Sequence, residues 1–165
     1  MTQKKVGFLP IINEQTRILI LGTLPSDTSL QKGEYYANPQ NQFWRIIFSL
    51  YNNGQALTSY DKKCELILKN RLGLWDVLKK ANRINSLDSN IHMEEVNDFE
   101  DLFSKYPNIK KIIFNGQNAA TYYQRLMNRL VKKDMIVLPS TSSANTSKTF
   151  SQKGREWEMG LNFNH

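Results

Sequence analysis

Apolar residues predict three buried strands along the chain. The segments 17–22, 110–116 and 134–139 are short, continuous apolar runs, closed by glycine or proline. Unbroken runs of this length are typical of strands covered on both faces, as in parallel sheets. A fourth, weaker strand is expected near residues 8–12 or just after Ala81.

Apolar residues at helical spacing lie between these strands. Those from Phe43 to Leu50 share one face of a helix expected to begin near Asn38-Pro39, because proline suits the first turn. Further helices are expected at 61–70, 74–80, 97–106, 117–132 and 150–160. Alternating strands and helices predict an α/β protein, a three-layer αβα sandwich with a central, mainly parallel four-stranded sheet. We expect residues 1–165 to form a single domain.

Composition excludes several classes of protein. The chain is 40% hydrophobic, which suffices for a core, but no apolar run approaches the roughly 20 residues of a membrane span. The first residues carry no signal-peptide pattern, so we expect a cytoplasmic protein. Cys64 is the only cysteine, and His92 and His165 have no partner at metal-ligand spacing. No metal and no cofactor are expected.

The net charge of +7 is unevenly distributed. Residues 86–104 carry acidic side chains and no basic ones, whereas residues 105–155 carry ten Lys or Arg against one acid, Asp134. A basic block of this kind can attract a polyanion such as DNA by releasing its counterions. An ordinary solvated basic surface would give the same pattern.

Polar loops follow the predicted strands. Ligands of parallel α/β sheets bind at the carboxyl ends of strands, which here are the segments after Gly22, Phe114 and Leu138. The first loop is long and rich in hydroxyls and amides, and residues 138–147 form a loop of small polar residues. Neither loop has a Walker or Gly-x-Gly-x-x-Gly pattern, which disfavours nucleotide-triphosphate chemistry. Both could also be plain connections with local side-chain caps.

Several of these segments resemble one enzyme family. Residues 22–26 (GTLPS) and 35–44 (YYANPQNQFW) resemble motif 1 and its helix in the uracil-DNA glycosylase superfamily, and residues 138–145 (LPSTSSAN) resemble motif 2. Residues 73–78 (GLWDVL) and 86–91 (SLDSNI) resemble the hypoxanthine (deoxyinosine) glycosylase branch. The resemblance extends from about residue 17 to residue 157. It implies an enzyme that removes deaminated bases from DNA.

One position departs from the superfamily pattern. Leu24 stands where most members place a catalytic asparagine before the motif 1 proline, and leucine cannot orient water. The hypoxanthine branch also lacks that amide and is similar to this chain in relying on the asparagine before the Phe-Trp pair. The resemblance therefore implies that Asn41 is the catalytic residue, holding a water molecule beneath C1′ of the deoxyribose. An amide in a first helical turn also commonly bonds free backbone N–H groups.

The resemblance also implies a binding pocket for an extruded base. Tyr36 is expected to stack on the base, unless it simply packs in the core as we expect of Tyr35. Backbone N–H groups around Thr23 and Ser26 would bind the base oxygen, with Leu24 lining the pocket. Asn115 would read a base edge, although Asn-Gly after a strand is often just a turn.

The motif 2 loop is expected to bind the DNA backbone. Small polar residues there would grip phosphates, with a lysine nearby for charge: Ser140, Thr141, Ser142, Ser143, Asn145 and Lys148. The lysines lie on helices expected to be exposed, so none is an obvious Schiff-base nucleophile. This favours base release without strand cleavage.

The sequence thus predicts a monomeric, monofunctional glycosylase acting on DNA that contains deaminated bases. Hypoxanthine is the expected base, with uracil and xanthine left open. One alternative is a catalytically inactive DNA-binding module of the same fold, because of Leu24 and a missing motif 2 histidine. Another is a small α/β hydrolase using Ser26 or Ser140, but no Gly-x-Ser-x-Gly elbow is present.

Overall fold

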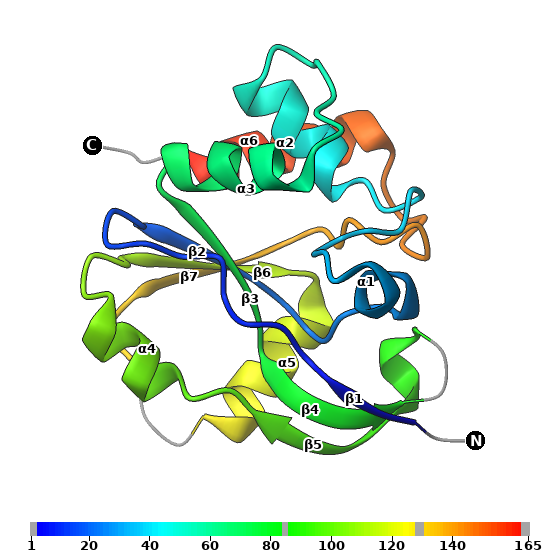
Figure 1. Ribbon diagram of the computed structural model, residues 1–165, viewed down its shortest axis with the longest axis vertical. Coiled ribbons are helices and arrows are strands. Elements are labelled where there is room, and N and C mark those ends of the chain that lie inside the picture. The colour runs from blue at the N-terminus through cyan, green and yellow to red at the C-terminus, as the bar shows by residue number, and fades with distance from the viewer. Residues whose placement is uncertain (1–2, 84–85, 128–130, 163–165) are drawn as a thin grey trace.

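A four-stranded parallel sheet forms the centre of the molecule. The computed structural model describes residues 3–83, 86–127 and 131–162 (Figure 1). The sheet has the order β3-β2-β6-β7, and its strands are β2 (Ile18–Gly22), β3 (Leu72–Asp76), β6 (Lys111–Asn115) and β7 (Asp134–Leu138). Every pairing in it is parallel. The predicted α/β class and parallel sheet are confirmed.

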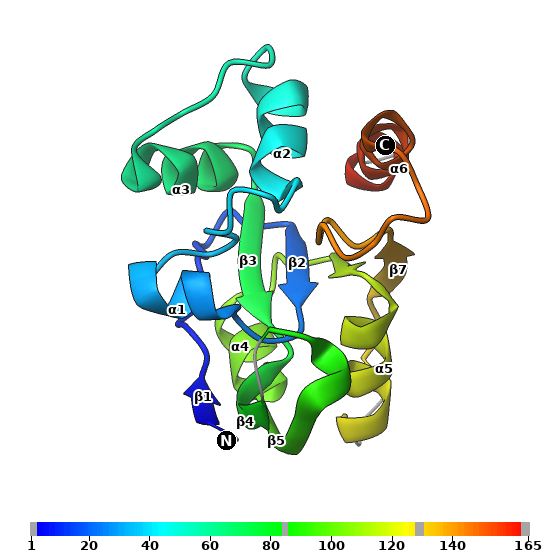
Figure 2. The ribbon, with the colours of Figure 1, turned by 90° about the vertical axis from the view of Figure 1, so that its right-hand side faces the viewer.

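Helices cover both faces of this sheet because its central strand is apolar on both. Ile18 and Ile20 of β2 join the core beneath helices α2 (Phe43–Tyr51), α3 (Tyr60–Lys69) and α6 (Phe150–Leu161). Leu19 and Leu21 face the other core, beneath α4 (Phe99–Lys105) and α5 (Gln117–Leu126). Figure 2 shows the helical layers on opposite sides of the strands.

Three expected helices are confirmed with ends close to those predicted. The expected ranges 61–70, 97–106 and 150–160 correspond to α3, α4 and α6. The helix expected at 117–132 ends at Leu126, and residues 128–130 lie outside the described part of the chain.

The segment 74–80, expected to be a helix, is instead two strands. β3 completes the parallel sheet, and β4 (Leu78–Arg83) follows after Val77. Leu74, Trp75 and Leu78 satisfy helical spacing equally well, but pairing with β2 fixes the extended form. Of the two places expected for a fourth strand, the one at residues 8–12 is wrong, since Ile11 forms only an isolated bridge with Leu74. The residues just after Ala81 do lie in a strand, β4, but it belongs to an antiparallel sheet.

Strand β7 lies at the edge of the sheet. Met135 is 39% exposed and Val137 is 43% exposed, whereas every residue of β2 is buried. The expectation that β7 is covered on both faces is therefore wrong. An apolar run in the sequence does not say which strand will be outermost.

A second, antiparallel sheet was not predicted. It has the order β1-β4-β5, with β1 (Gln3–Val6) and β5 (Ile91–Val96) on either side of β4. Between β4 and β5 lies the short helix η1 (Asp88–Asn90). Lys5 of β1 forms an ion pair with Asp27 of α1 (Asp27–Lys32), joining this sheet to the loop after β2.

Helix α2 begins later than expected. Its first residue is Phe43 and its N-cap is Gln42, so the expected start near Asn38-Pro39 is wrong. Residues 38–41 form a hydrogen-bonded turn instead, with the Asn41 N–H donating to the Asn38 carbonyl, which places Asn41 ahead of the helix. No helix within the described ranges is long and apolar enough to cross a membrane.

Candidate active site

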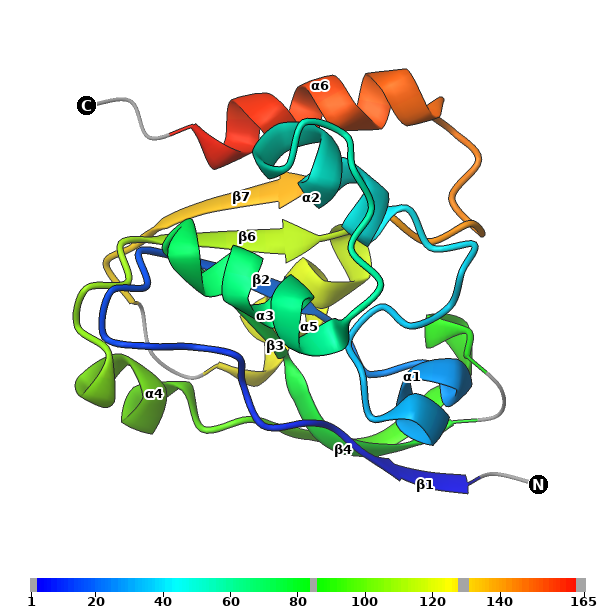
Figure 3. The ribbon, with the colours of Figure 1, turned by 45° about the horizontal axis from the view of Figure 1, so that its top comes forward.

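One cavity lies at the carboxyl edge of the parallel sheet. Its volume is about 430 Å³, within the usual range for a small-molecule site. Segments after all four strands line it: 22–26 after β2, Asp76 ending β3, Asn115 ending β6 and 140–145 after β7. Figure 3 shows β6 and β7 pointing to the side where these loops meet. The site is where the strand order reverses, the position expected for a ligand.

The Asn41 side chain has a fixed orientation. Its Oδ1 accepts hydrogen bonds from the Phe43 backbone N–H at 2.9 Å and from Thr141 Oγ1 at 2.8 Å. Since a backbone N–H can only donate, the amide cannot be turned the other way. Nδ2 has no partner among the residues that the structure describes. Asn41 thus bonds the first turn of α2 and still presents two N–H donors.

Thr141 links the loop before α2 to the end of β6, and its side chain is buried. Its side chain is fully buried, its N–H donates to Asn115 Oδ1 and its carbonyl accepts from the Gln42 N–H. Its hydroxyl donates to Asn41 and accepts from Asn115 Nδ2 at 2.9 Å. Every polar atom of Thr141 is therefore used inside the protein. The expected contact of Thr141 with phosphates is wrong, because these bonds bury it.

Asn115 holds the motif 2 loop through both ends of its amide. The two bonds to Thr141 use Oδ1 and one N–H of Nδ2. Only the second N–H of Nδ2 remains to read a base, so the role expected for Asn115 narrows to that of a single donor. Gly116 follows with φ +94°, and a Cβ there would lie 3.0 Å from Ser140, so the turn needs glycine.

Tyr36 lines the cavity with one face of its ring already covered. The ring stacks on Phe43 with 4.0 Å between centroids and 25° between planes. Tyr36 also has φ +52°, an unusual conformation for a bulky residue and one often found at functional sites. Its hydroxyl is buried and lacks a hydrogen-bond partner in the described chain. Tyr35, in contrast, is a core residue whose hydroxyl donates to Leu9.

The motif 1 turn forms the wall beside Tyr36. Thr23 and Leu24 are each 7% exposed, and Leu24 also belongs to the core beneath α4 and α5. Ser26 is the N-cap of α1, and its Oγ accepts from the Ser29 N–H at 3.1 Å. The Thr23 carbonyl accepts from the Leu78 N–H, which fixes the turn against β4.

The remaining motif 2 residues form the rim of the cavity. Ser143 is exposed, and Ser140, Ser142 and Asn145 are half-buried. Asn145 Nδ2 donates to the Ser140 carbonyl at 3.1 Å, closing the loop on itself.

A buried lysine supports this rim from below. Lys153 of α6 is 1% exposed, and its Nζ donates to the Asn145 carbonyl at 2.8 Å. The expectation that the lysines lie on exposed helices is therefore wrong for Lys153. Burial lowers the pKa of its ammonium group.

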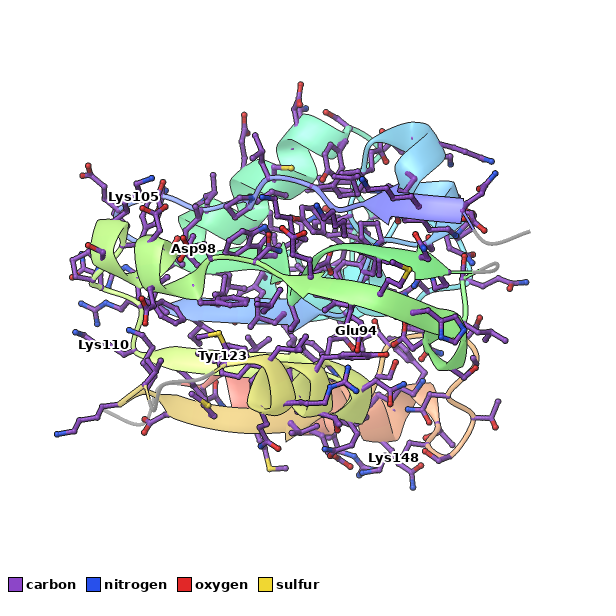
Figure 4. All side chains as sticks on the ribbon, turned by 90° about the horizontal axis from the view of Figure 1, so that it is seen from below. Glu94, Asp98, Lys105, Lys110, Tyr123 and Lys148 are labelled. Atoms are coloured by element: carbon purple, nitrogen blue, oxygen red, sulfur yellow. The ribbon has the colours of Figure 1, made fainter. Side chains whose placement is uncertain are left out.

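The basic block expected from the sequence does not form one surface. Lys148 lies beside a neighbouring groove and pairs with Glu156. Figure 4 shows Lys105 and Lys110 at the opposite end of the molecule from Lys148. Arg129, also part of the block, lies outside the described residues. Charge near the cavity is thus smaller than the sequence total suggests.

Three charged side chains of the cavity were not foreseen. Asp76 and Arg83 are 4% and 1% exposed, and Arg83 donates to the Pro25 carbonyl and faces Asp88 at 3.4 Å. Burial, reinforced by the Asp88 charge and opposed by Arg83, raises the pKa of Asp76 to about 7. Burial also raises the pKa of Asp88. The strand-end rule would have identified Asp76 had β3 been recognised.

The structure offers no evident place for a metal. Within residues 3–83, 86–127 and 131–162, no three His, Cys, Asp or Glu side chains gather as a ligand group. The chemistry available at the cavity is that of amides, hydroxyls, an aromatic ring and buried carboxyls. Groups of these kinds are suited to binding and orienting a planar, hydrogen-bonding ligand.

Comparison with known proteins identifies the family. The model of the uracil DNA glycosylase superfamily matches residues 9–159. A hypoxanthine DNA glycosylase of Methanosarcina acetivorans is 44% identical over 98% of this chain and 99% of its own length. A second protein of that name, from Methanosarcina barkeri, is 39% identical over 91% of this chain and 94% of its own length.

The fold agrees with a solved relative. A solution NMR structure of a candidate uracil DNA glycosylase from Methanosarcina acetivorans superposes with a TM-score of 0.82, at 41% identity, covering 96% of this chain and 97% of the other. Fold, cavity and relatives define a DNA glycosylase, an enzyme with DNA as its substrate. The chain belongs to the uracil DNA glycosylase superfamily.

Proposed function

We propose that this DNA glycosylase removes hypoxanthine from DNA by hydrolysing the N-glycosidic bond of an extruded deoxyinosine. The observation that carries the proposal is the single cavity where Asn41, Tyr36 and the 140–145 loop meet. The two relatives named hypoxanthine DNA glycosylase support the choice of base. A flipped base needs a pocket that replaces its lost stacking and reads its edge, and this cavity contains groups for both tasks.

In the proposed mechanism, Asn41 positions the attacking water. Because Oδ1 is occupied by Phe43 and Thr141, the Nδ2 donors hold the water oxygen, with a remaining lone pair free for C1′ of the sugar. The amide does not take a proton from water. It contributes by fixing geometry, while the bond breaks toward a positively charged sugar and a negatively charged base.

Tyr36 and the motif 1 turn receive the base. The ring face of Tyr36 that is not covered by Phe43 is the surface on which the base stacks. Backbone N–H groups around Thr23 and Ser26 lie at the wall and bind the base oxygen, and Leu24 excludes water. Ser140, Ser142, Ser143 and Asn145 at the rim contact the DNA backbone, and Lys148 adds charge beside them.

We further propose that the enzyme is monofunctional. Covalent strand cleavage needs an amine that can reach C1′, and no lysine is found among the described residues lining the cavity. Lys153, the buried lysine nearest the loop, is bonded to backbone carbonyls instead. That the enzyme works as a cytoplasmic monomer without a metal stays a prediction.

The test is a base-release assay with purified protein. Duplex and single-stranded DNA containing deoxyinosine, deoxyuridine or deoxyxanthosine is incubated, and free bases are separated by chromatography. Hypoxanthine should be released from deoxyinosine DNA, leaving an intact abasic strand that breaks only on treatment with alkali. A nick formed without alkali would refute the monofunctional proposal. Salt-dependent DNA binding with no released base would favour an inactive binding module.

The role of Asn41 is tested by Asn41→Ala. The rate of base release should fall by at least about tenfold while DNA affinity is retained, since only positioning of water is lost. Gln40→Ala is the matched control, because Gln40 is the exposed neighbour of Asn41. Wild-type rates in Asn41→Ala would remove this residue from the mechanism.

A further inference from the structure

One oxygen of a buried carboxyl group that lines the cavity has no partner among the described residues. Asp76 is the last residue of β3 and is 4% exposed, yet it lines the cavity. Its Oδ2 is buried without a hydrogen bond to any described residue. Buried polar groups are nearly always paired, and leaving one unpaired costs about 1–3 kcal/mol. An unpaired carboxyl in a binding cavity indicates a partner that arrives with the ligand.

The Asp76 carboxyl and the Tyr36 hydroxyl both lie beside Gly22. A Cβ built on Gly22 would lie 2.6 Å from Asp76 Oδ1 and 3.1 Å from the Tyr36 hydroxyl. Both side chains therefore converge on the same backbone position, and the Tyr36 hydroxyl is also buried without a partner. Glycine at position 22 leaves room for this convergence. The Asp76 carboxyl and the Tyr36 hydroxyl thus lie close together among the groups that line the cavity.

We infer that Asp76 is a catalytic residue that acts as a neutral carboxylic acid, donating a hydrogen bond to the keto oxygen of the departing base. This inference rests on the proposed function and adds a residue to it. When the C1′–N bond breaks, its electron pair leaves with the base, and the negative charge spreads over the ring to the keto oxygen. Asp76 keeps its proton throughout. Water supplies the hydroxyl group on C1′ and, in sum, the proton that the base takes up.

The surroundings of Asp76 favour the neutral acid. Burial and the nearby Asp88 raise its pKa to about 7, against the opposing charge of Arg83. Burial raises the pKa of the Tyr36 phenol, which therefore stays protonated. Asp88, Arg83, Tyr36 and Tyr35 are the charged or titratable groups that influence Asp76 or are influenced by it. Above neutral pH, Asp76 becomes a carboxylate and repels the base anion.

A carboxyl group that donates to the base affects the rate differently from a carboxyl group that only supports the fold. A hydrogen-bond donor aimed at a developing oxyanion typically contributes a factor of about 10² to 10³ in rate. A carboxylate cannot provide that donor. The rate should therefore depend on the protonation of Asp76, whereas a packing role would give no such pH dependence.

The experiment measures single-turnover base release from deoxyinosine duplex between pH 5.5 and 9. In the wild-type enzyme the rate should fall above about pH 7, approaching tenfold per pH unit. Asp76→Asn keeps an N–H donor that does not titrate, so its rate should stay level across the same range. Asp76→Ala should be slower than wild type by at least about tenfold at pH 6. Asp134→Asn, at an exposed acid of β7, is the matched control and should follow wild type.

Two outcomes would overturn the inference. One is a wild-type rate in Asp76→Ala, and the other is an unchanged decline above pH 7 in Asp76→Asn. Failure of the proposed function is seen separately, as an absence of hypoxanthine release by the wild-type enzyme at every pH. In that case the contact between Asp76 and the base is tested by measuring affinity for DNA that contains non-cleavable 2′-fluoro-deoxyinosine. The affinity of Asp76→Ala should be several-fold weaker than that of the wild type, because the contact is lost. Equal affinity in the two proteins would also overturn the inference.

Discussion

At the scale of the residue, the cavity is marked by side chains that are costly for folding. Asp76 and Tyr36 each bury an oxygen without a partner, and Tyr36 adopts a positive φ. Each feature costs stability, on the order of 1–3 kcal/mol. Such costs are characteristic of sites where groups are held ready for a ligand rather than for the fold itself.

The Asp76 carboxyl should make stability fall as pH rises. In the unfolded chain it ionises near its ordinary pKa of 3.8, and in the folded protein near 7. Between these values the unfolded state loses a proton that the folded state keeps, so rising pH favours unfolding until about pH 7. The full loss is about 4 kcal/mol, taken from a shift of about three units.

Denaturant unfolding of wild type and Asp76→Asn at pH 4.5 and 8.5 measures this effect. The wild type should lose more unfolding free energy over that interval than Asp76→Asn, because asparagine does not titrate. Equal losses in both proteins would show that Asp76 is ionised in the folded state at low pH.

Many residues that line the cavity could be predicted from the sequence, but the hydrogen bonds between them could not. The sequence placed Asn41, Tyr36, Leu24 and the 140–145 loop at one sheet edge, and the structure brings them together. It could not predict that Oδ1 of Asn41 is occupied twice or that Thr141 is fully buried. Those facts depend on contacts between residues 100 positions apart in the chain.

At the scale of the element, Thr141 holds two loops together through its hydroxyl and its backbone. Thr141 joins the loop before α2, through Asn41, to the end of β6, through Asn115. The Thr141 carbonyl also accepts from Gln42, the N-cap of α2. The orientation of Asn41 therefore depends on the position of the motif 2 loop.

Thr141→Val should loosen the contact between these loops with almost no change in volume, while the two backbone hydrogen bonds of residue 141 remain. It removes the donor to Asn41 and leaves Asn115 Nδ2 without its acceptor, which should cost about 1–3 kcal/mol of unfolding free energy. Base release should slow by more than about tenfold, because the Asn41 side chain is then held by the Phe43 N–H alone. Thermal unfolding and single-turnover rates measure the two effects. Thr146→Val, at an exposed position of the same loop, should change neither, and equal activity in both variants would contradict this role.

Local patterns predicted the elements that are buried on both faces, but not those decided by distant pairing. β2 and β6 follow from continuous apolar runs, since only a central strand of a parallel sheet needs them. β3 was mistaken for a helix because its spacing suits both forms. β1 and β5 contain many polar residues and become strands only by pairing with β4, which is far from β1 in the sequence but close to β5.

At the scale of the whole molecule, the parallel sheet is held in place by apolar cores on both of its faces. Helices lie on both faces (Figure 1), and the cavity lies at the edge of the sheet where the loops after the strands converge. The second sheet contributes Arg83 of β4 to the cavity lining, and the helix η1 between β4 and β5 contributes Asp88. Charge contributes less to the site than the net value of +7 suggests, because Lys105 and Lys110 lie at the far end (Figure 4).

The most direct test is a structure of the enzyme bound to duplex DNA containing non-cleavable 2′-fluoro-deoxyinosine. The extruded base should occupy the cavity at the strand ends, with its ring on the open face of Tyr36. Its keto oxygen should face Asp76, and the sugar should face Nδ2 of Asn41. An inosine that stays stacked in the duplex, or that binds away from this cavity, would contradict the account.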